Sequence, residues 1–153
     1  MKAVKQNLIL MADDDADDRL LVKDALAEGH LDGNIRFVAD GEELMDYLLR
    51  RRQYADAASA PMPGLILLDL NMPRKDGREA LREIRAHADL RRIPVVVFTT
   101  SKADIDIEAI YDLGANSFVP KPVAFDALMK IMNGLDKYWF GIVELPQPRS
   151  KFL

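Results

Sequence analysis

Five residues with chemically active side chains stand at the ends of four short apolar runs. Two carboxylates follow the first run, one follows the second, a hydroxyl ends the third and an amine follows the fourth: Asp13, Asp14, Asp69, Thr99 and Lys121. A carboxylate directly after buried apolar residues is costly unless it is paired. Because several runs end in this way, the pattern favours one shared polar site over unrelated surface groups.

The elements that must position these residues are predicted from the apolar periodicity. Apolar runs typical of buried strands cover residues 8–12, 35–39, 65–68, 95–98 and 117–119. Apolar residues at helical spacing follow each run, within residues 21–26, 44–48, 81–88, 107–111 and 125–132. Five strands alternating with five helices predict an α/β fold, a doubly wound parallel sheet covered by helices on both faces.

In such a sheet the five polar side chains are expected to converge, because parallel strands bring their carboxyl ends to one edge. Two carboxylates ~4 Å apart repel each other by about 4 kcal/mol at an effective dielectric constant of about 20. Mg²⁺ suits hard oxygen ligands and commonly takes one or two carboxylates. We therefore expect Mg²⁺ and Lys121 to balance the charges of Asp13, Asp14 and Asp69.

This combination of groups predicts phosphoryl chemistry. An aspartate beside Mg²⁺, a lysine and a hydroxyl is placed to attack phosphorus and to form an aspartyl phosphate. The cation and Lys121 would stabilise charge on the transferring oxygens, and Thr99 could donate a hydrogen bond to one of them. Asp69, which follows the most apolar run, is the expected nucleophile.

All of these residues except Asp69 also have a simpler interpretation when they are taken alone. The acids within residues 13–18 could cap the first helix and favour its positive end. Lys121 alone would be a surface lysine in most proteins, and Thr99 alone would be the end of a strand. The ordered combination of all five residues favours the site.

Composition limits the function classes. A chain of 153 residues with 49% hydrophobic residues predicts one globular domain, and a net charge of −4 gives no reason to expect a nucleic-acid partner. Arg50–Arg52 is interpreted as a solvated helix end, followed by a long loop to residue 63. The sequence has no cysteine and no apolar stretch near 20 residues, so thiolate chemistry and a membrane span are excluded and a cytoplasmic location is expected.

The chain resembles the receiver domain of two-component response regulators over about residues 7–140. The matching motifs are ILMADDD, LILLDLNMP followed by DG, VVVFTTS and FVPKPV. The resemblance implies a CheY-like, flavodoxin-like sheet with strand order 2-1-3-4-5. It also implies a receiver domain over 1–140 and a tail over 141–153, with no separate output domain.

The resemblance assigns roles to the residues at the strand ends. Asp69 matches the acid that accepts a phosphoryl group from the histidine of a sensor kinase. Asp13 and Asp14 match the acidic pair that helps to bind Mg²⁺ together with Asp69, and Asn71 matches a position whose backbone carbonyl is a further ligand. The expected function is that of a phosphoacceptor signalling protein, which promotes its own phosphotransfer and dephosphorylation, rather than that of an enzyme with an external substrate.

The switch residues follow from the same resemblance. Thr99 and Lys121 match the hydroxyl and the lysine that contact the phosphoryl group and couple its arrival to a loop shift. Phe118 falls at the switching aromatic position, which is often tyrosine, so it has no ring hydroxyl with which to signal its position. Family members usually hold the bond before Pro122 in cis, and the same is expected here.

The long loop and the tail YWFGIVELP look most like the small receiver proteins that serve bacterial phytochromes. The implied partner is a sensor histidine kinase, with a bacteriophytochrome as the specific expectation. The aromatic and apolar residues of 138–143 either cover an edge of the same subunit or take part in a homodimer contact. A second expected dimer surface is the face formed by the fourth helix, the fifth strand and the fifth helix.

Two other function classes fit the same topology less well. A phosphohydrolase with Asp69 as nucleophile would be expected to carry a second acid two residues later, where this chain has Asn71. A flavin-binding module would need a hydroxyl-rich or glycine-rich phosphate loop after the first strand. The three aspartates of 13–15 would repel a phosphate there.

Overall fold

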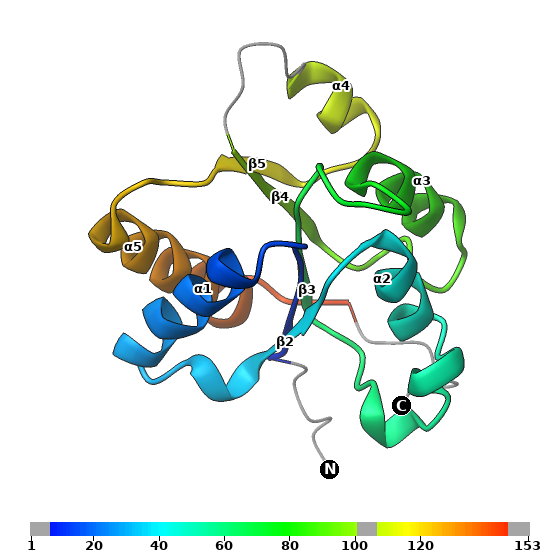
Figure 1. Ribbon diagram of the computed structural model, residues 1–153, viewed down its shortest axis with the longest axis horizontal. Coiled ribbons are helices and arrows are strands. Elements are labelled where there is room, and N and C mark those ends of the chain that lie inside the picture. The colour runs from blue at the N-terminus through cyan, green and yellow to red at the C-terminus, as the bar shows by residue number, and fades with distance from the viewer. Residues whose placement is uncertain (1–6, 101–106, 147–153) are drawn as a thin grey trace.

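A parallel sheet of five strands, in the order β2-β1-β3-β4-β5, forms the centre of the molecule (Figure 1). The computed structural model describes residues 7–100 and 107–146. The strands are β1 (Ile9–Ala12), β2 (Ile35–Val38), β3 (Leu65–Leu68), β4 (Val95–Thr99) and β5 (Ser117–Pro120). The helices are α1 (Ala16–Glu28), α2 (Gly41–Leu48), α3 (Gly77–Ala86), α4 (Ile107–Asp112) and α5 (Phe125–Asp136). The predicted fold class and strand order are both confirmed.

The helices cover both faces of the sheet, α1 and α5 on one side and α2, α3 and α4 on the other (Figure 1). Successive side chains of a strand point to opposite faces, so each central strand contributes side chains to two cores. In β3, Leu65 and Leu67 pack with the residues of α1 and α5, whereas Ile66 and Leu68 pack on the side of α2, α3 and α4. This two-sided burial explains why the central strands are continuous apolar runs.

Aspartates begin three of the helices close to the edge where the strands end. The side chains of Asp15, Asp40 and Asp76 accept hydrogen bonds from backbone N–H groups in the first turns of α1, α2 and α3. Each side chain satisfies N–H groups that have no partner within the helix, which stabilises a helix start by about 1 kcal/mol. The caps fix where each helix begins relative to the strand before it.

Two glycines permit close approach of the loop that follows β3. A Cβ atom on Gly77 would collide with the backbone carbonyl of Asp69, and one on Gly41 would collide with that of Lys75. The N–H of Gly41 donates to the carbonyl oxygen of Lys75 at 3.0 Å. The segment after Asp69 is therefore held tightly against the start of α2.

The loop expected after Arg50–Arg52 contains two short 3₁₀ helices, Arg52–Tyr54 and Ala57–Ser59. Its residues lack apolar periodicity, so hydrogen bonds to side chains of α2 hold it in place. The hydroxyl of Tyr47 donates to the carbonyl oxygen of Pro61 at 2.6 Å, and the hydroxyl of Tyr54 donates to Glu43 at 2.7 Å.

A π-helical turn, Lys137–Ile142, continues α5 into the tail. Trp139 and Phe140 are half-buried and pack against the core beneath α1 and α5, while Tyr138 and Ile142 are exposed. The structure thus shows packing within the subunit for two of the tail's aromatic residues. None of the helices within 7–100 and 107–146 combines the length and hydropathy that crossing a bilayer requires.

Candidate functional site

Asp69 lies directly after β3, in the middle of the sheet, and is buried. Its backbone N–H donates to the carbonyl oxygen of Ala12 at 3.0 Å, which continues the ladder between β3 and β1 by one residue. Asp13 follows Ala12 and is fully buried. The register of neighbouring parallel strands therefore places these two carboxylates side by side.

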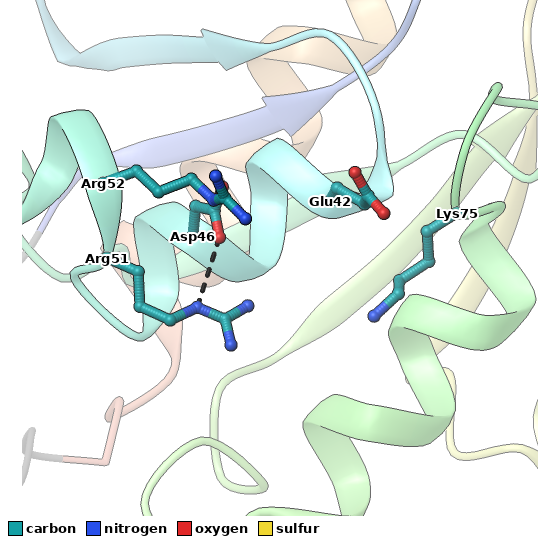
Figure 2. Close-up of a pocket in the computed structure, with 5 residues that line it drawn as sticks. All are labelled: Glu42, Asp46, Arg51, Arg52 and Lys75. Atoms are coloured by element: carbon teal, nitrogen blue, oxygen red, sulfur yellow. Dashed lines mark ion pairs between the residues drawn. The ribbon is translucent and has the colours of Figure 1, made fainter.

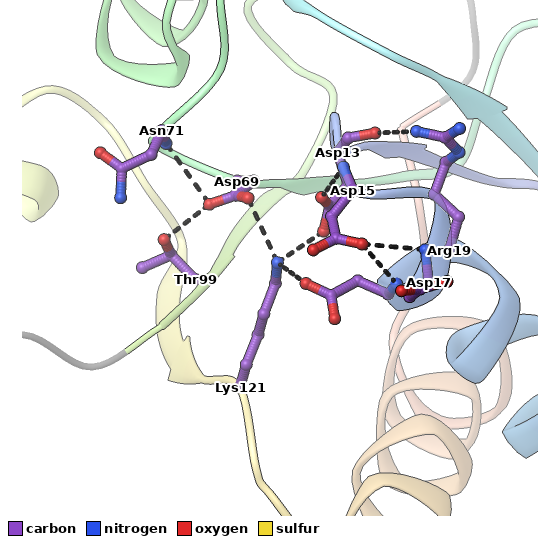
Figure 3. Close-up of polar contacts among 9 residues, drawn as sticks. Asp13, Asp15, Asp17, Arg19, Asp69, Asn71, Thr99 and Lys121 are labelled. Atoms are coloured by element: carbon purple, nitrogen blue, oxygen red, sulfur yellow. Dashed lines mark hydrogen bonds and ion pairs between the residues drawn. The ribbon is translucent and has the colours of Figure 1, made fainter.

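Both carboxylate oxygens of Asp69 are hydrogen-bonded (Figure 3). Oδ1 accepts from the hydroxyl of Thr99 at 2.7 Å and from the backbone N–H of Asn71 at 3.4 Å. Oδ2 accepts from the ammonium group of Lys121 at 3.2 Å. Thr99 is the last residue of β4 and is fully buried.

Lys121 bridges three carboxylates. Its Nζ atom lies 2.6 Å from Asp13, 2.8 Å from Asp18 and 3.2 Å from Asp69, and its side chain is only 10% exposed. Burial acts to lower the pKa of Lys121, but the carboxylates of Asp13 and Asp18 outweigh it and raise that pKa. The amine is therefore a firmly charged ammonium that offsets part of the negative charge of the site.

Asp13 is a fully buried acid with a shifted pKa. Burial raises its pKa to about 6, although Lys121 and the backbone N–H of Asp15 both act to lower it. The guanidinium group of Arg19 donates to the backbone carbonyl of Asp13 at 2.7 Å and so ties α1 to the end of β1. A carboxylate with so little access to water favours a cationic neighbour.

The acidic cluster fits a divalent cation. One carboxylate oxygen each from Asp13, Asp14 and Asp69 can be chosen so that all three lie within 4.8 Å of one another. Asp14 is exposed, so the cluster is open to solvent on that side. Carboxylate oxygens are the donors that Mg²⁺, Ca²⁺ and Mn²⁺ prefer.

The structure brings Asp13, Asp14, Asp69, Thr99 and Lys121 together, as expected from their places at strand ends. Asn71 lies two residues beyond Asp69 and is exposed, and its backbone N–H faces Asp69. The proposed ligand role of its carbonyl stays a prediction.

The structure differs from the sequence-based expectation at the peptide bond before Pro122. No peptide bond in the described part of the chain is cis, so the expectation of a cis bond before Pro122 is wrong for this structure. The trans form is the intrinsically favoured one, by about 0.5–1 kcal/mol.

The sequence did not reveal the contact between Asp18 and Lys121, because an acid in the first turn of a helix is already explained by the helix dipole.

Phe118 is the second residue of β5. It is half-buried against the core under α2, α3 and α4, and its backbone N–H donates to the hydroxyl of Tyr111 at 3.2 Å. In the pairing of β5 with β4, Phe118 lies beside Val97. The switch role of Phe118 stays a prediction.

A charged cavity of about 370 Å³ lies beside α2, and its lining residues are not those of the acidic cluster (Figure 2). It is lined by Glu42, Asp46, Arg51, Arg52 and Lys75. Asp46 pairs with the Nε atoms of both arginines, at 3.2 and 3.3 Å, and Lys75 pairs with Glu83. The arginines thus pair with an acid of the lining, whereas the partner of Lys75 lies outside it.

Residues 9–133 match the response regulator receiver domain family. The match spans most of the chain, and the fold and the acidic cluster agree with it. The chain therefore belongs to the response regulator receiver family, and it is a signalling protein of two-component systems rather than an enzyme with an external substrate.

Relatives within this family point to a narrower group. Response regulator Rcp1 of Synechocystis sp. is 40% identical over 139 residues, which cover 91% of this chain and 92% of Rcp1. The crystal structure of the phosphorylated cyanobacterial phytochrome response regulator RcpA superposes with a TM-score of 0.83 at 39% identity, covering 94% of this chain and 100% of RcpA. The Mn²⁺-bound form of Rcp1 gives a TM-score of 0.79 at 39% identity, covering 92% and 99% of the two chains. The chain is thus a receiver-type response regulator related to phytochrome-associated regulators.

Proposed function

We propose that Asp69 is the phosphoacceptor of this response regulator and receives its phosphoryl group from a sensor histidine kinase. The observation that carries the proposal is the convergence on one buried carboxylate of a hydroxyl, an ammonium group and two further acids. Thr99 and Lys121 come from different strand ends, and together they provide donors for a group that carries several negative oxygens.

The transfer is an in-line displacement at phosphorus. A carboxylate oxygen of Asp69 forms the new bond to phosphorus, and the bond between phosphorus and the donor breaks. The electron pair of the broken bond leaves on the donor, which is an imidazole nitrogen for phosphohistidine and acetate for acetyl phosphate. Lys121 and Thr99 already lie against Asp69, so they are placed to stabilise the charge of the transferring oxygens.

Mg²⁺ is the proposed cation, held by Asp13, Asp14, Asp69 and the backbone carbonyl of Asn71. The three carboxylates form the acidic cluster described above, and Rcp1 has been crystallised with Mn²⁺. When it is bound, the cation would neutralise charge on the phosphoryl oxygens. The exposed side of the cluster, at Asp14, leaves room for the cation and the donor to enter.

We further propose that phosphorylation changes a binding surface through Thr99, Lys121 and Phe118. The hydroxyl of Thr99 and the ammonium of Lys121 contact Asp69, so a phosphoryl group there changes the partners of both. Thr99 pairs with Pro120 in the ladder between β4 and β5, so movement at the end of β4 reaches the strand that carries Phe118.

The expected kinase is a phytochrome, because RcpA and two further structural relatives are described as phytochrome or bacteriophytochrome response regulators. The expected location is the cytoplasm. A homodimer would use the tail, where Tyr138 and Ile142 are exposed, or the α4–β5–α5 face, where Ile107 and Tyr111 are exposed. Light scattering of the purified protein, with and without phosphorylation, tests both dimer proposals.

A phosphohydrolase acting on an external substrate is the alternative, and it is not favoured. Asn71 occupies the place where such an enzyme would carry its second acid, and the family match is to receivers. The amide of Asn71 cannot serve as a general acid.

The direct test is labelling with acetyl phosphate and Mg²⁺, followed by intact-mass measurement. The wild-type protein is expected to gain one phosphoryl group, and Asp69→Asn is expected to gain none. Removal of the cation with EDTA should abolish labelling. The matched control is Asp76→Asn, which lies in the same loop and caps α3. Equal labelling of the Asp69→Asn variant would overturn the assignment.

A further inference from the structure

Asp18 is a third carboxylate on Lys121, and neither the phosphoacceptor role nor the proposed metal site uses it. Its Oδ2 atom lies 2.8 Å from Nζ of Lys121, closer than the 3.2 Å between Nζ and Asp69. Asp18 lies in the first turn of α1, and its backbone N–H donates to the capping side chain of Asp15 at 3.3 Å. The helix start therefore fixes the position from which Asp18 reaches the lysine.

The ammonium group of Lys121 has three N–H donors, and three carboxylates accept from it: Asp13, Asp18 and Asp69. A phosphoryl oxygen on Asp69 must therefore take a donor that already serves a carboxylate. The contact with Asp13 is fixed on both sides, because Asp13 is fully buried and Lys121 is 10% exposed. The side chain of Asp18 is 35% exposed, so Asp18 is the partner that water can most readily replace.

We propose that Asp18 is a positioning residue that holds Lys121 on the α1 side of the pocket and so limits how strongly the lysine engages the phosphoryl group. The inference rests on the proposed role of Asp69 and extends it to the regulation of that site. Asp18 acts through Lys121 and does not itself touch the phosphoryl group. Its charge competes with that group for one N–H donor.

The proposal predicts that the negative charge of Asp18 limits the rate of phosphorylation. Without that charge, Lys121 directs a further donor toward the transferring oxygens, whose negative charge grows in the transition state. Asp18→Asn keeps the size of the side chain and removes the charge. We expect it to speed labelling by acetyl phosphate at saturating Mg²⁺ about three- to tenfold.

The matched control is Asp17→Asn, which removes the same charge one residue away. Asp17 is exposed, and among the described residues the ion pairs of Lys121 are with Asp13, Asp18 and Asp69. Asp17→Asn reports the general effect of lower negative charge on an anionic donor, and it should change the rate less than twofold. Asp18→Glu retains the charge and should return the rate to within about twofold of the wild type.

A double-mutant cycle with Lys121 separates positioning from a structural role. If Asp18 acts through the lysine, Asp18→Asn changes the labelling rate in the wild type but not in a Lys121→Ala background. Thermal melting establishes that each variant is folded, and Asp18→Ser, which removes the charge with a smaller side chain, serves as a second variant should Asp18→Asn not fold.

The inference is overturned if Asp18→Asn labels no faster than Asp17→Asn, or if its effect persists without Lys121. These outcomes differ from failure of the proposed function, in which the wild-type protein itself is not labelled at Asp69.

Discussion

The proposed phosphoacceptor Asp69 is contacted by two donors that differ in how many partners they share. Thr99 is fully buried at the end of β4, and its hydroxyl donates to Asp69. Lys121 reaches the site from beyond β5 and is shared among three acids. A donor shared among several acids can exchange partners when a phosphoryl group arrives, which suits the switch role proposed for Lys121.

Replacing Thr99 by Ala should slow labelling without abolishing it. The variant loses the 2.7 Å hydrogen bond to Asp69, and one positioned donor commonly contributes about tenfold or more to such a step. Thr99→Ser keeps a hydroxyl and should retain most of the rate. The time course of labelling by acetyl phosphate at fixed Mg²⁺ measures both variants. A rate for Thr99→Ala equal to that of the wild type would remove Thr99 from the site.

Lys121→Ala should still be labelled but should not transmit the change. Asp69 and the cation ligands are intact in this variant, so the bond to phosphorus still forms. The lysine that links β5 to the phosphoryl group is missing. Partner binding or oligomeric state is measured before and after phosphorylation, and no response is expected. A normal response would show that coupling runs through other residues.

At the scale of elements, the loop after β3 is clamped to the start of α2. The guanidinium group of Arg74 donates to Oδ2 of Asp40 at 2.6 and 3.0 Å. Arg74 has a left-handed backbone conformation with φ of 65°, which is unusual for a residue with a side chain. The same Asp40 caps α2 through the N–H of Glu43. One buried carboxylate thus holds a helix start and the segment that follows Asp69.

The clamp predicts a pH-dependent contribution to stability. Burial acts to raise the pKa of Asp40, but the N–H of Glu43 and the guanidinium of Arg74 outweigh it and lower that pKa below the usual 3.8. A group whose pKa is lower in the folded state stabilises the fold above its unfolded pKa, and this stabilisation is lost as the pH falls through the folded pKa.

Asp40→Asn keeps a capping side chain but loses the charge, so it should lower the free energy of unfolding at pH 7 by about 1–3 kcal/mol. The difference from the wild type should shrink below about pH 4. Urea unfolding measures it at about pH 7 and 5, above the usual pKa of 3.8, and at about pH 3.5, where the loss should begin. Asp56→Asn, at an exposed cap of a 3₁₀ helix, is the control for the same change of side chain outside the clamp. A difference that stays constant with pH would exclude the charged clamp.

At the scale of the whole molecule, the sheet separates two cores, and the tail closes one of them. The core under α2, α3 and α4 lies beside the loop of 49–64, whereas the core under α1 and α5 is extended by Trp139 and Phe140. Tyr138 packs edge-on against Trp139, with ring centroids 5.1 Å apart. The tail is therefore part of the receiver's own packing, and its exposed residues are the ones available to a partner.

Trp139→Ala should destabilise the protein by about 2 kcal/mol, because it removes a large, half-buried aromatic side chain. Ile142→Ala, at a side chain that is 64% exposed, should change the free energy of unfolding by less than about 0.5 kcal/mol. Chemical denaturation measures both variants. Labelling of Asp69 should be unchanged in each. Equal stability of the wild type and Trp139→Ala would mean that the tail does not pack on this core in solution.

Much of the fold could be predicted because its strands are buried on both faces. The run Leu65–Leu68 has to be apolar throughout, so it stands out in the sequence. The acids and the lysine at strand ends were likewise visible, because a charge directly after such a run is unusual. Asp18 and Arg74 were not, since a helix's first turn or a surface loop accounts for such residues equally well.

The sequence by itself determined the order of strands and helices along the chain, because this follows from local periodicity. It also determined which polar residues reach the edge of the sheet, because this follows from the parallel topology. Only the tertiary structure decided which charges pair. Lys121 forms ion pairs with Asp13, Asp18 and Asp69, and Arg74 forms one with Asp40. In each case the partners are far apart in the chain. Pairing between distant residues depends on strand register, helix starts and side-chain reach, and no local pattern in the sequence encodes all three.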